Sequence, residues 1–119
     1  MYAELINKMA GEVRHDNEHW WRHPRTGKPL KPNKGQQLML MVSEISEAME
    51  GERKGLMDDH LPHRKAAEVE LADLLIRLLD YAGGWGLDLG GAYMEKREYN
   101  RTRADHSNAA RLKKGGKKW

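Results

Sequence analysis

Apolar residues recur at helical spacing in four stretches of the chain, and polar or helix-breaking residues separate these stretches. In the first, Leu5, Met9 and Val13 form one apolar stripe. No segment alternates with period two for long enough to indicate a strand. The pattern therefore predicts an all-α fold, a compact four-helix bundle-like domain. The predicted helices cover residues 2–18, 34–53, 63–82 and 88–103.

The loops carry residues that end or begin helices. The segment HWWRHPRTGKPLKPN contains three prolines and a glycine, which are incompatible with a continuing helix. In GLMDDHLPH, Asp59 is expected to cap the third helix, and Pro62 suits its first turn. These signals set the expected start of the third helix near residue 63.

The second half of the chain is divided in the same way. The third helix is expected to stop at GGWG, and Asp88 is expected to cap the fourth. No repeat and no long linker divides the sequence. We therefore predict one domain over residues 1–105, followed by a basic tail, 106–119, that is expected to be mobile without ligand.

The second helix is apolar on nearly every side at the level of LMLMV, the five residues 38–42. Such a helix must be surrounded by other apolar surface. Three neighbouring helices in a chain of 119 residues do not readily cover it. The pattern therefore predicts a homodimer or homotetramer whose subunits pack along the second and third helices.

Composition narrows the possible classes of function. The 21 basic and 18 acidic side chains leave a net charge of +3, much of it in the last nine residues, RLKKGGKKW. A short basic tail without interleaved aromatics makes a nucleic-acid partner unexpected. The absence of cysteine excludes disulfides and thiolate zinc sites, and no apolar run predicts a membrane span or signal peptide. We expect a cytoplasmic protein with no membrane partner.

A narrow polar stripe crosses the otherwise apolar third helix. At about 100° per residue, Glu70, Asp73, Arg77 and Asp80 fall within a sector roughly 80° wide. An ordinary surface helix has a broader polar face. The stripe is therefore interpreted as a polar seam that faces a specific ligand or partner.

The second helix carries a matching pair, Glu44 and Glu47, one turn apart. Facing each other, the two helices would gather four carboxylates together with Glu70 and Asp73, an arrangement that needs a compensating cation or protons. Mg²⁺ or Mn²⁺ suits oxygen ligands of this kind, and Arg77 is expected to brace one carboxylate. Both spacings are also common on solvated helices, where they serve solubility alone.

The combination resembles the MazG-like all-α nucleoside triphosphate pyrophosphohydrolases. Their pattern is an ExxE pair, then ExxD on the next helix, then a helix with a lysine and an asparagine one turn apart. The matching segments here are EISE, ELAD and KREYNRTR, within residues 37–103. Many relatives carry a further glutamate where this chain has Ser43.

The resemblance implies hydrolysis of a nucleoside triphosphate between the α and β phosphates, with Mg²⁺ held by the four carboxylates. It also implies phosphate or sugar contacts from Lys96, Asn100 and Arg103, whose alternative interpretation is a solvated basic face. Trp20 and Trp21 correspond loosely to aromatics that hold the base in relatives. Adjacent tryptophans at a helix end also commonly close a core.

Two non-enzymatic alternatives stay open. His15, His19 and His23 recur every four residues, a spacing that can bind zinc, although Pro24 indicates that the helix is ending there. The basic tail would support an accessory protein that binds nucleic acid weakly and in a salt-sensitive manner. The tail residues concerned are Arg111, Lys113, Lys114, Lys117 and Lys118.

Overall fold

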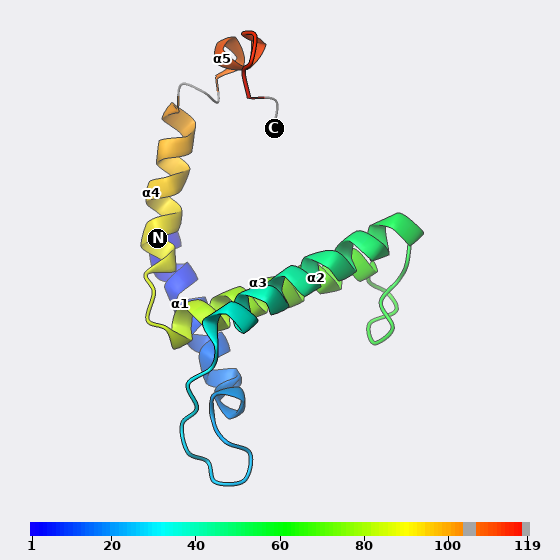
Figure 1. Ribbon diagram of the computed structural model, residues 1–119, viewed down its shortest axis with the longest axis vertical. Helices are drawn as coiled ribbons and strands as arrows, with labels where there is room; N and C mark the ends of the chain where they lie inside the picture. Colours follow the sequence, from blue (N-terminus) through cyan, green and yellow to red (C-terminus); the bar gives the residue numbers. More distant parts are fainter. Residues whose placement is uncertain (104–106, 118–119) are drawn as a thin grey trace. The chain divides into compact units, whose positions relative to one another are not determined.

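The computed structural model describes residues 1–103 and 107–117 and is all-α there, as predicted (Figure 1). Its helices are α1 (Tyr2–Asp16), the short 3-10 helix η1 (Glu18–Trp21), α2 (Lys34–Lys54), α3 (Ala66–Gly84), α4 (Leu89–Thr102) and α5 (Asn108–Leu112). The described residues form no strand beyond two isolated bridges, between Arg22 and Pro29 and between Met57 and Lys65. No helix in this part of the chain combines the length and apolarity needed to cross a bilayer.

The chain forms two compact units, Lys8–Leu87 and Met1–Asn7 with Asp88–Trp119. In the larger unit, α2 and α3 lie side by side (Figure 1). Gly55 ends α2 with a left-handed φ of 61°, a conformation that glycine adopts without steric cost. This arrangement places the faces of α2 and α3 that carry the predicted site next to each other.

The predicted start of α3 is wrong by three residues. The Asp58 carboxylate accepts the backbone N–H groups of His60 and Leu61 at 2.9 and 2.8 Å, which forms a turn instead of a helix cap. Lys65, which pairs with Met57 in an isolated bridge, is itself extended, with φ −64° and ψ 141°. Lys65, rather than Asp59, is therefore the N-cap, and its backbone N–H bonds the Glu68 carboxylate at 3.1 Å.

The third helix stops within GGWG, as predicted: α3 ends at Gly84, two residues beyond the expected last residue, and Gly86 follows with a left-handed φ of 66°. A Cβ on Gly83 would lie 2.6 Å from the Ala10 carbonyl oxygen. A Cβ on Gly84 would lie 2.2 Å from the indole ring of Trp21. Gly83 and Gly84 therefore also permit close packing of α1 and η1 against α3, a role that the sequence did not predict.

The smaller unit contains α4 and the short helix α5. The Asp88 carboxylate accepts the Gly91 N–H at 2.8 Å, which confirms Asp88 as the cap of α4. Asn7 bonds both Asp88 and the Gly90 N–H, each at 2.8 Å. The fifth helix was not predicted: the Ser107 hydroxyl caps it by accepting the Ala110 N–H at 3.2 Å. The predicted domain boundary at residues 105 and 106 lies outside the described residues.

The core of the described residues is small. Its buried apolar members are Ala10, Trp21, Met41, Ala48, Ala67, Leu79 and Ala82. Four of these seven are alanines, and no large side chain is less than 2% exposed. The larger unit therefore buries little apolar volume for its length.

Candidate metal centre

Three glutamates from α2 and α3 form the centre of the site. Glu44 and Glu47 lie on α2 and Glu70 on α3, and each offers a carboxylate oxygen within 4.8 Å of the others. Glu44 is only 7% exposed. Helical spacing on two neighbouring helices therefore identified three residues that the fold brings together.

Glu44 is held from one side and has no partner on the other. Arg77 on α3 donates from Nε to Glu44 Oε1 at 3.0 Å, which confirms the predicted bracing of a carboxylate by this arginine. The second oxygen, Oε2, is buried and has no hydrogen-bond partner among the described residues. A buried carboxylate oxygen without a partner is unfavourable, and a bound cation would satisfy it.

The pKa values of the clustered glutamates shift in opposite directions. Burial and the neighbouring Glu44 and Glu47 carboxylates raise the pKa of Glu70 to about 8. Burial alone would also raise the pKa of Glu44, but the neighbouring Glu70 carboxyl group and the Arg77 guanidinium outweigh it and hold that pKa below its ordinary value. Without a cation, a proton on Glu70 therefore relieves the repulsion between the carboxylates.

Asp73, the fourth predicted ligand, does not belong to this group of three. Its carboxyl group lines the same cavity as Glu44 and Arg77. Burial, followed by the negative charge of Glu44, raises the pKa of Asp73. Asp73 therefore lies within the electrostatic reach of the glutamates, on the wall of the cavity.

A cavity of about 580 Å³ extends from Glu44 to η1. One wall comes from α3, through Asp73, Ile76, Arg77 and Asp80. The opposite lining comes from the N-terminal half of α2 and from the two tryptophans of η1. The volume falls in the range of small-molecule sites, so Glu44 and Asp73 line a space that fits a nucleotide-sized ligand.

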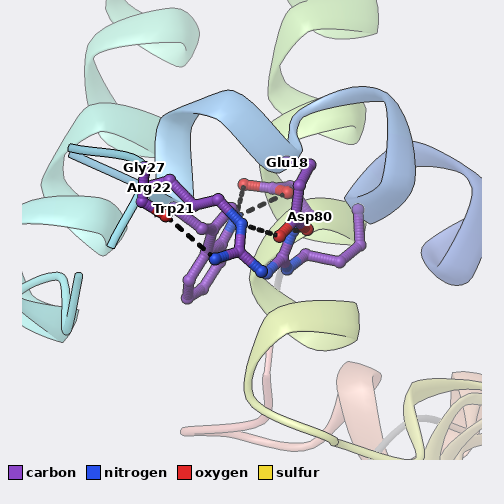
Figure 2. A network of polar contacts seen from close by, with 6 residues as sticks. Glu18, Trp21, Arg22, Gly27 and Asp80 are labelled. Atoms are coloured by element: carbon purple, nitrogen blue, oxygen red, sulfur yellow. Dashed lines mark hydrogen bonds and ion pairs between the residues drawn. The ribbon is translucent and has the colours of Figure 1, made fainter. Parts of the chain in front are cut away.

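A polar network fixes η1 on α3 beside this cavity (Figure 2). The Trp21 indole N–H donates to both Asp80 oxygens, at 3.0 and 3.1 Å. The Arg14 guanidinium lies 4.5 Å from the Trp21 ring centroid, and both Arg14 and Arg22 pair with Glu18. This network explains the last member of the polar stripe on α3, because Asp80 anchors a tryptophan.

The two predicted aromatic residues differ in exposure. Trp21 is 7% exposed and is held by Asp80, whereas Trp20 is 71% exposed, and both line the cavity. Burial raises the pKa of Asp80, although the bond from Trp21 opposes the shift. Trp20 therefore has a ring face available to a ligand, and base stacking by either residue stays a prediction.

Two of the predicted phosphate-binding residues, Lys96 and Asn100, lie on α4 in the smaller unit, and the third, Arg103, is the C-cap of this helix. The Tyr99 ring lies 4.7 Å from the Lys96 ammonium and 5.6 Å from the Arg103 guanidinium. Lys96 and Asn100 also line a shallow hollow of about 390 Å³ with Tyr93, Arg97 and Arg101. The three residues therefore lie in the C-terminal part of α4 and at its C-cap, and their contact with a nucleotide stays a prediction.

The structure does not gather the histidines considered for zinc. Among the described residues, only Glu44, Glu47 and Glu70 form a group of three with suitable ligand atoms, and no histidine joins them. His23 lies in the loop, where its Nδ1 accepts the N–H groups of Arg25 and Thr26, each at 3.2 Å. The basic tail is described up to Lys117, so Lys118 lies outside the described residues.

Comparison with known proteins adds no family assignment. No family model, curated protein or solved structure matches the chain.

The raised pKa of Glu70 predicts that the metal-free protein loses stability as the pH rises. The unfolded chain releases this proton near pH 4.5 and the folded chain near pH 8, so the stabilising contribution is complete below pH 4.5 and is lost as the pH passes 8. The raised pKa values of Asp73 and Asp80 act in the same sense. The lowered pKa values act in the opposite sense, but below this window; they belong to Glu18, Glu44, Glu50 and Asp88. Thermal unfolding in EDTA at pH 5.5 and 8.5 measures the difference, expected to be several degrees in Tm.

Mg²⁺ is expected to raise Tm more at pH 8.5 than at pH 5.5, because a cation competes with the proton for the same oxygens. Glu70→Gln should remove both the pH dependence and the Mg²⁺ effect. Glu52→Gln, at an exposed position of α2, is the matched control. Equal Mg²⁺ effects in both variants would contradict a cation site at Glu70.

Proposed function

We propose that this protein is a Mg²⁺-dependent nucleoside triphosphate pyrophosphohydrolase, with Mn²⁺ as an alternative ion. The observation that carries the proposal is Glu44 Oε2, a buried carboxylate oxygen with no hydrogen-bond partner among the described residues. Glu44 belongs to the group of three glutamates and also lines a nucleotide-sized cavity. The resemblance of EISE, ELAD and KREYNRTR to the MazG-like pattern supports the same reaction. Its role would be removal of unwanted or excess nucleotides in the cytoplasm.

The residues present fit a hard cation. All three clustered ligands are carboxylates, which Mg²⁺ and Mn²⁺ prefer, and one oxygen is buried without a hydrogen bond from any described residue. Glu44, Glu47 and Glu70 would hold the ion, and Asp73 would complete the acidic wall. A divalent ion bound there would neutralise phosphate oxygens and lower the pKa of a bound water.

The chain's own residues prepare this site in three ways. Arg77 fixes Glu44 Oε1 and favours its ionised form, so Oε2 keeps its negative charge and its direction. Glu70 must release its proton before all three carboxylates can act together. Asp73 carries a raised pKa on the cavity wall, which suits a group that accepts a proton from an attacking water.

The two ends of the cavity differ in chemistry, which favours one orientation of a bound nucleotide. Its carboxylate end suits the phosphates with their cation, and its tryptophan end, with the exposed Trp20 and the fixed Trp21, suits the base. Lys96, Asn100 and Arg103 are proposed to bind phosphate or sugar, Lys96 as a point charge and Arg103 as a forked donor. A neutral amide at Asn100 would add a hydrogen bond.

The test is a turnover assay with Mg²⁺ against the four common deoxynucleoside triphosphates and their ribose counterparts. We expect one nucleoside monophosphate and one pyrophosphate per turnover, no free orthophosphate, and complete loss of turnover in EDTA. Release of orthophosphate would place the cleavage at a different bond. No turnover of any nucleotide by folded protein loaded with Mg²⁺ would instead favour the alternative, a non-enzymatic helical module that binds nucleotide or nucleic acid.

We also propose that the partner of this chain is a second copy of itself. On α2, the residues 38, 42, 45 and 49 follow the 4-3-4 spacing of a helix-packing seam. This seam lies roughly 160° around α2 from Glu44 and Glu47. The seam, one neighbouring methionine of α2 and two leucines of α3 together form an apolar face. Each side chain of this face is 46% to 66% exposed. The members of this apolar face are Leu38, Met39, Val42, Ile45, Met49, Leu71 and Leu75.

Two properties of this face favour a permanent partner. Its accessible area is roughly 600 Å², if each half-exposed side chain contributes about 90 Å². This area reaches the upper limit of the largest apolar patch on a typical monomer, and it approaches the ~800 Å² that each subunit buries in a standard interface. The core beneath it consists mainly of alanines, so the unit needs additional burial in order to fold. A second copy is always present and offers the same self-complementary seam, in a dimer or a tetramer built from such dimers.

A further inference from the structure

Gln37 on α2 has a side-chain amide whose orientation is fixed. The Trp85 indole Nε1 donates to Gln37 Oε1 at 2.8 Å. An indole N–H can only donate, so the amide must turn its oxygen toward Trp85 and its NH₂ group away. Among the described residues, none accepts a hydrogen bond from that NH₂ group.

Trp85 is itself held from three sides. The Lys34 ammonium lies 4.4 Å from its ring centroid. The Trp21 ring packs against it edge-on at 5.7 Å, and the Tyr81 ring is tilted toward it at 6.3 Å. The hydrogen-bond donor that orients Gln37 therefore belongs to a packed aromatic cluster, which prevents the amide from flipping.

Gln37 lines the same cavity as Glu44 and Trp20. It precedes Glu44 by seven residues, or about two helical turns, on the same face of α2, which separates the two by roughly 10 Å along the helix. A nucleotide with its phosphates at Glu44 would extend its base toward Gln37 and the exposed Trp20 ring. The oriented NH₂ group then meets the edge of the base.

We propose that Gln37 is a specificity-determining residue that selects bases with a carbonyl oxygen over bases with an amino group at the same ring position. This inference rests on the proposed function for the placement of the nucleotide. A fixed N–H donor bonds a carbonyl oxygen such as uracil O4 or hypoxanthine O6. It opposes the amino group of cytosine or adenine, where two donors would face each other without a partner.

The experiment compares two substrate pairs that differ at this group, dUTP with dCTP and dITP with dATP. For the wild type we expect kcat/KM to be at least about 10-fold higher for the carbonyl member of each pair. Gln37→Glu replaces the donor by an acceptor that still bonds Trp85, and should shift both ratios toward the amino base by about 100-fold. Gln36→Glu adds the same charge to the same cavity and should leave the ratios within about 3-fold.

Trp85→Phe supplies a second variant with the wild-type Gln37. It keeps an aromatic ring in the cluster but removes the indole N–H, so the amide can rotate and the ratios should fall toward 1. A wild type without preference in either pair would overturn the inference, as would equal shifts in Gln36→Glu and Gln37→Glu.

Binding of dUMP and dCMP with Mg²⁺, followed by tryptophan fluorescence, separates this inference from the proposed function. Turnover without base preference overturns the role of Gln37 and leaves the hydrolase proposal intact. Absent turnover, with dUMP binding that exceeds dCMP binding and reverses in Gln37→Glu, overturns the hydrolase proposal and supports the role of Gln37 in recognition. A protein that shows neither turnover nor monophosphate binding would overturn both the hydrolase proposal and the role of Gln37.

Discussion

Glu44→Gln is expected to reduce kcat/KM for every nucleotide by at least about 10³-fold. The substitution keeps the size of the side chain but removes the charge that Arg77 holds in place at 3.0 Å. It also replaces one of the two carboxylate oxygens with an NH₂ group, which binds neither a cation nor a guanidinium. Steady-state turnover with pyrophosphate detection measures the loss.

Two further readouts separate this effect from misfolding. Glu44→Gln should retain the far-ultraviolet circular dichroism of the wild type and lose the Mg²⁺-dependent rise in Tm, because the oxygen without a partner belongs to this residue. Glu52→Gln makes the same chemical change two turns along α2, at an exposed position, and should retain turnover within about 2-fold. Near-normal turnover in Glu44→Gln would remove the carboxylate cluster from the mechanism.

Helical periodicity predicted the parts of the site that depend on one helix face meeting another. Glu44, Glu47 and Glu70 were identified because 100° per residue fixes which side chains share a face, and α2 and α3 do lie side by side. Arg77 was found by the same rule. Such inferences need only the helices and their pairing, both of which the apolar pattern indicates.

Contacts between a helix and a loop or a distant segment were not predictable in this way. The partner of Asp80 is the Trp21 indole, 59 positions away, and the partner of Gln37 is Trp85, 48 positions away. GGWG correctly predicts the end of α3, but it does not predict that the missing side chains of Gly83 and Gly84 admit Ala10 and Trp21. The spacing of residues within one segment does not indicate which side chain from a distant segment will contact it.

The start of α3 shows the same limit on a smaller scale. Two adjacent aspartates preceded a proline, and the sequence favoured Asp59 as the cap. The structure uses Asp58 to build a turn, and this displaces the helix start to Ala66. Cap signals identify that a helix begins nearby, and the competing turn geometry decides the residue.

Ile45→Glu is expected to raise the dissociation constant of the dimer by at least about 10³-fold, or about 4 kcal/mol. Ile45 lies in the middle of the seam on α2 and is 50% exposed in the single chain. In a two-fold dimer the substitution occurs in both copies, so two carboxylates would enter one apolar interface. Light scattering during gel filtration at micromolar concentration measures the mass.

Leu61→Glu is the matched control, because Leu61 is 47% exposed but lies in the loop between α2 and α3, outside the apolar face. It should keep the mass and the Tm of the wild type. In Ile45→Glu we expect loss of the dimer together with a lower Tm, because seven apolar side chains per chain return to water above a core made mainly of alanine. A wild type that is monomeric and equally stable at all concentrations would show that this small core suffices alone, and the exposed seam would then need a different partner.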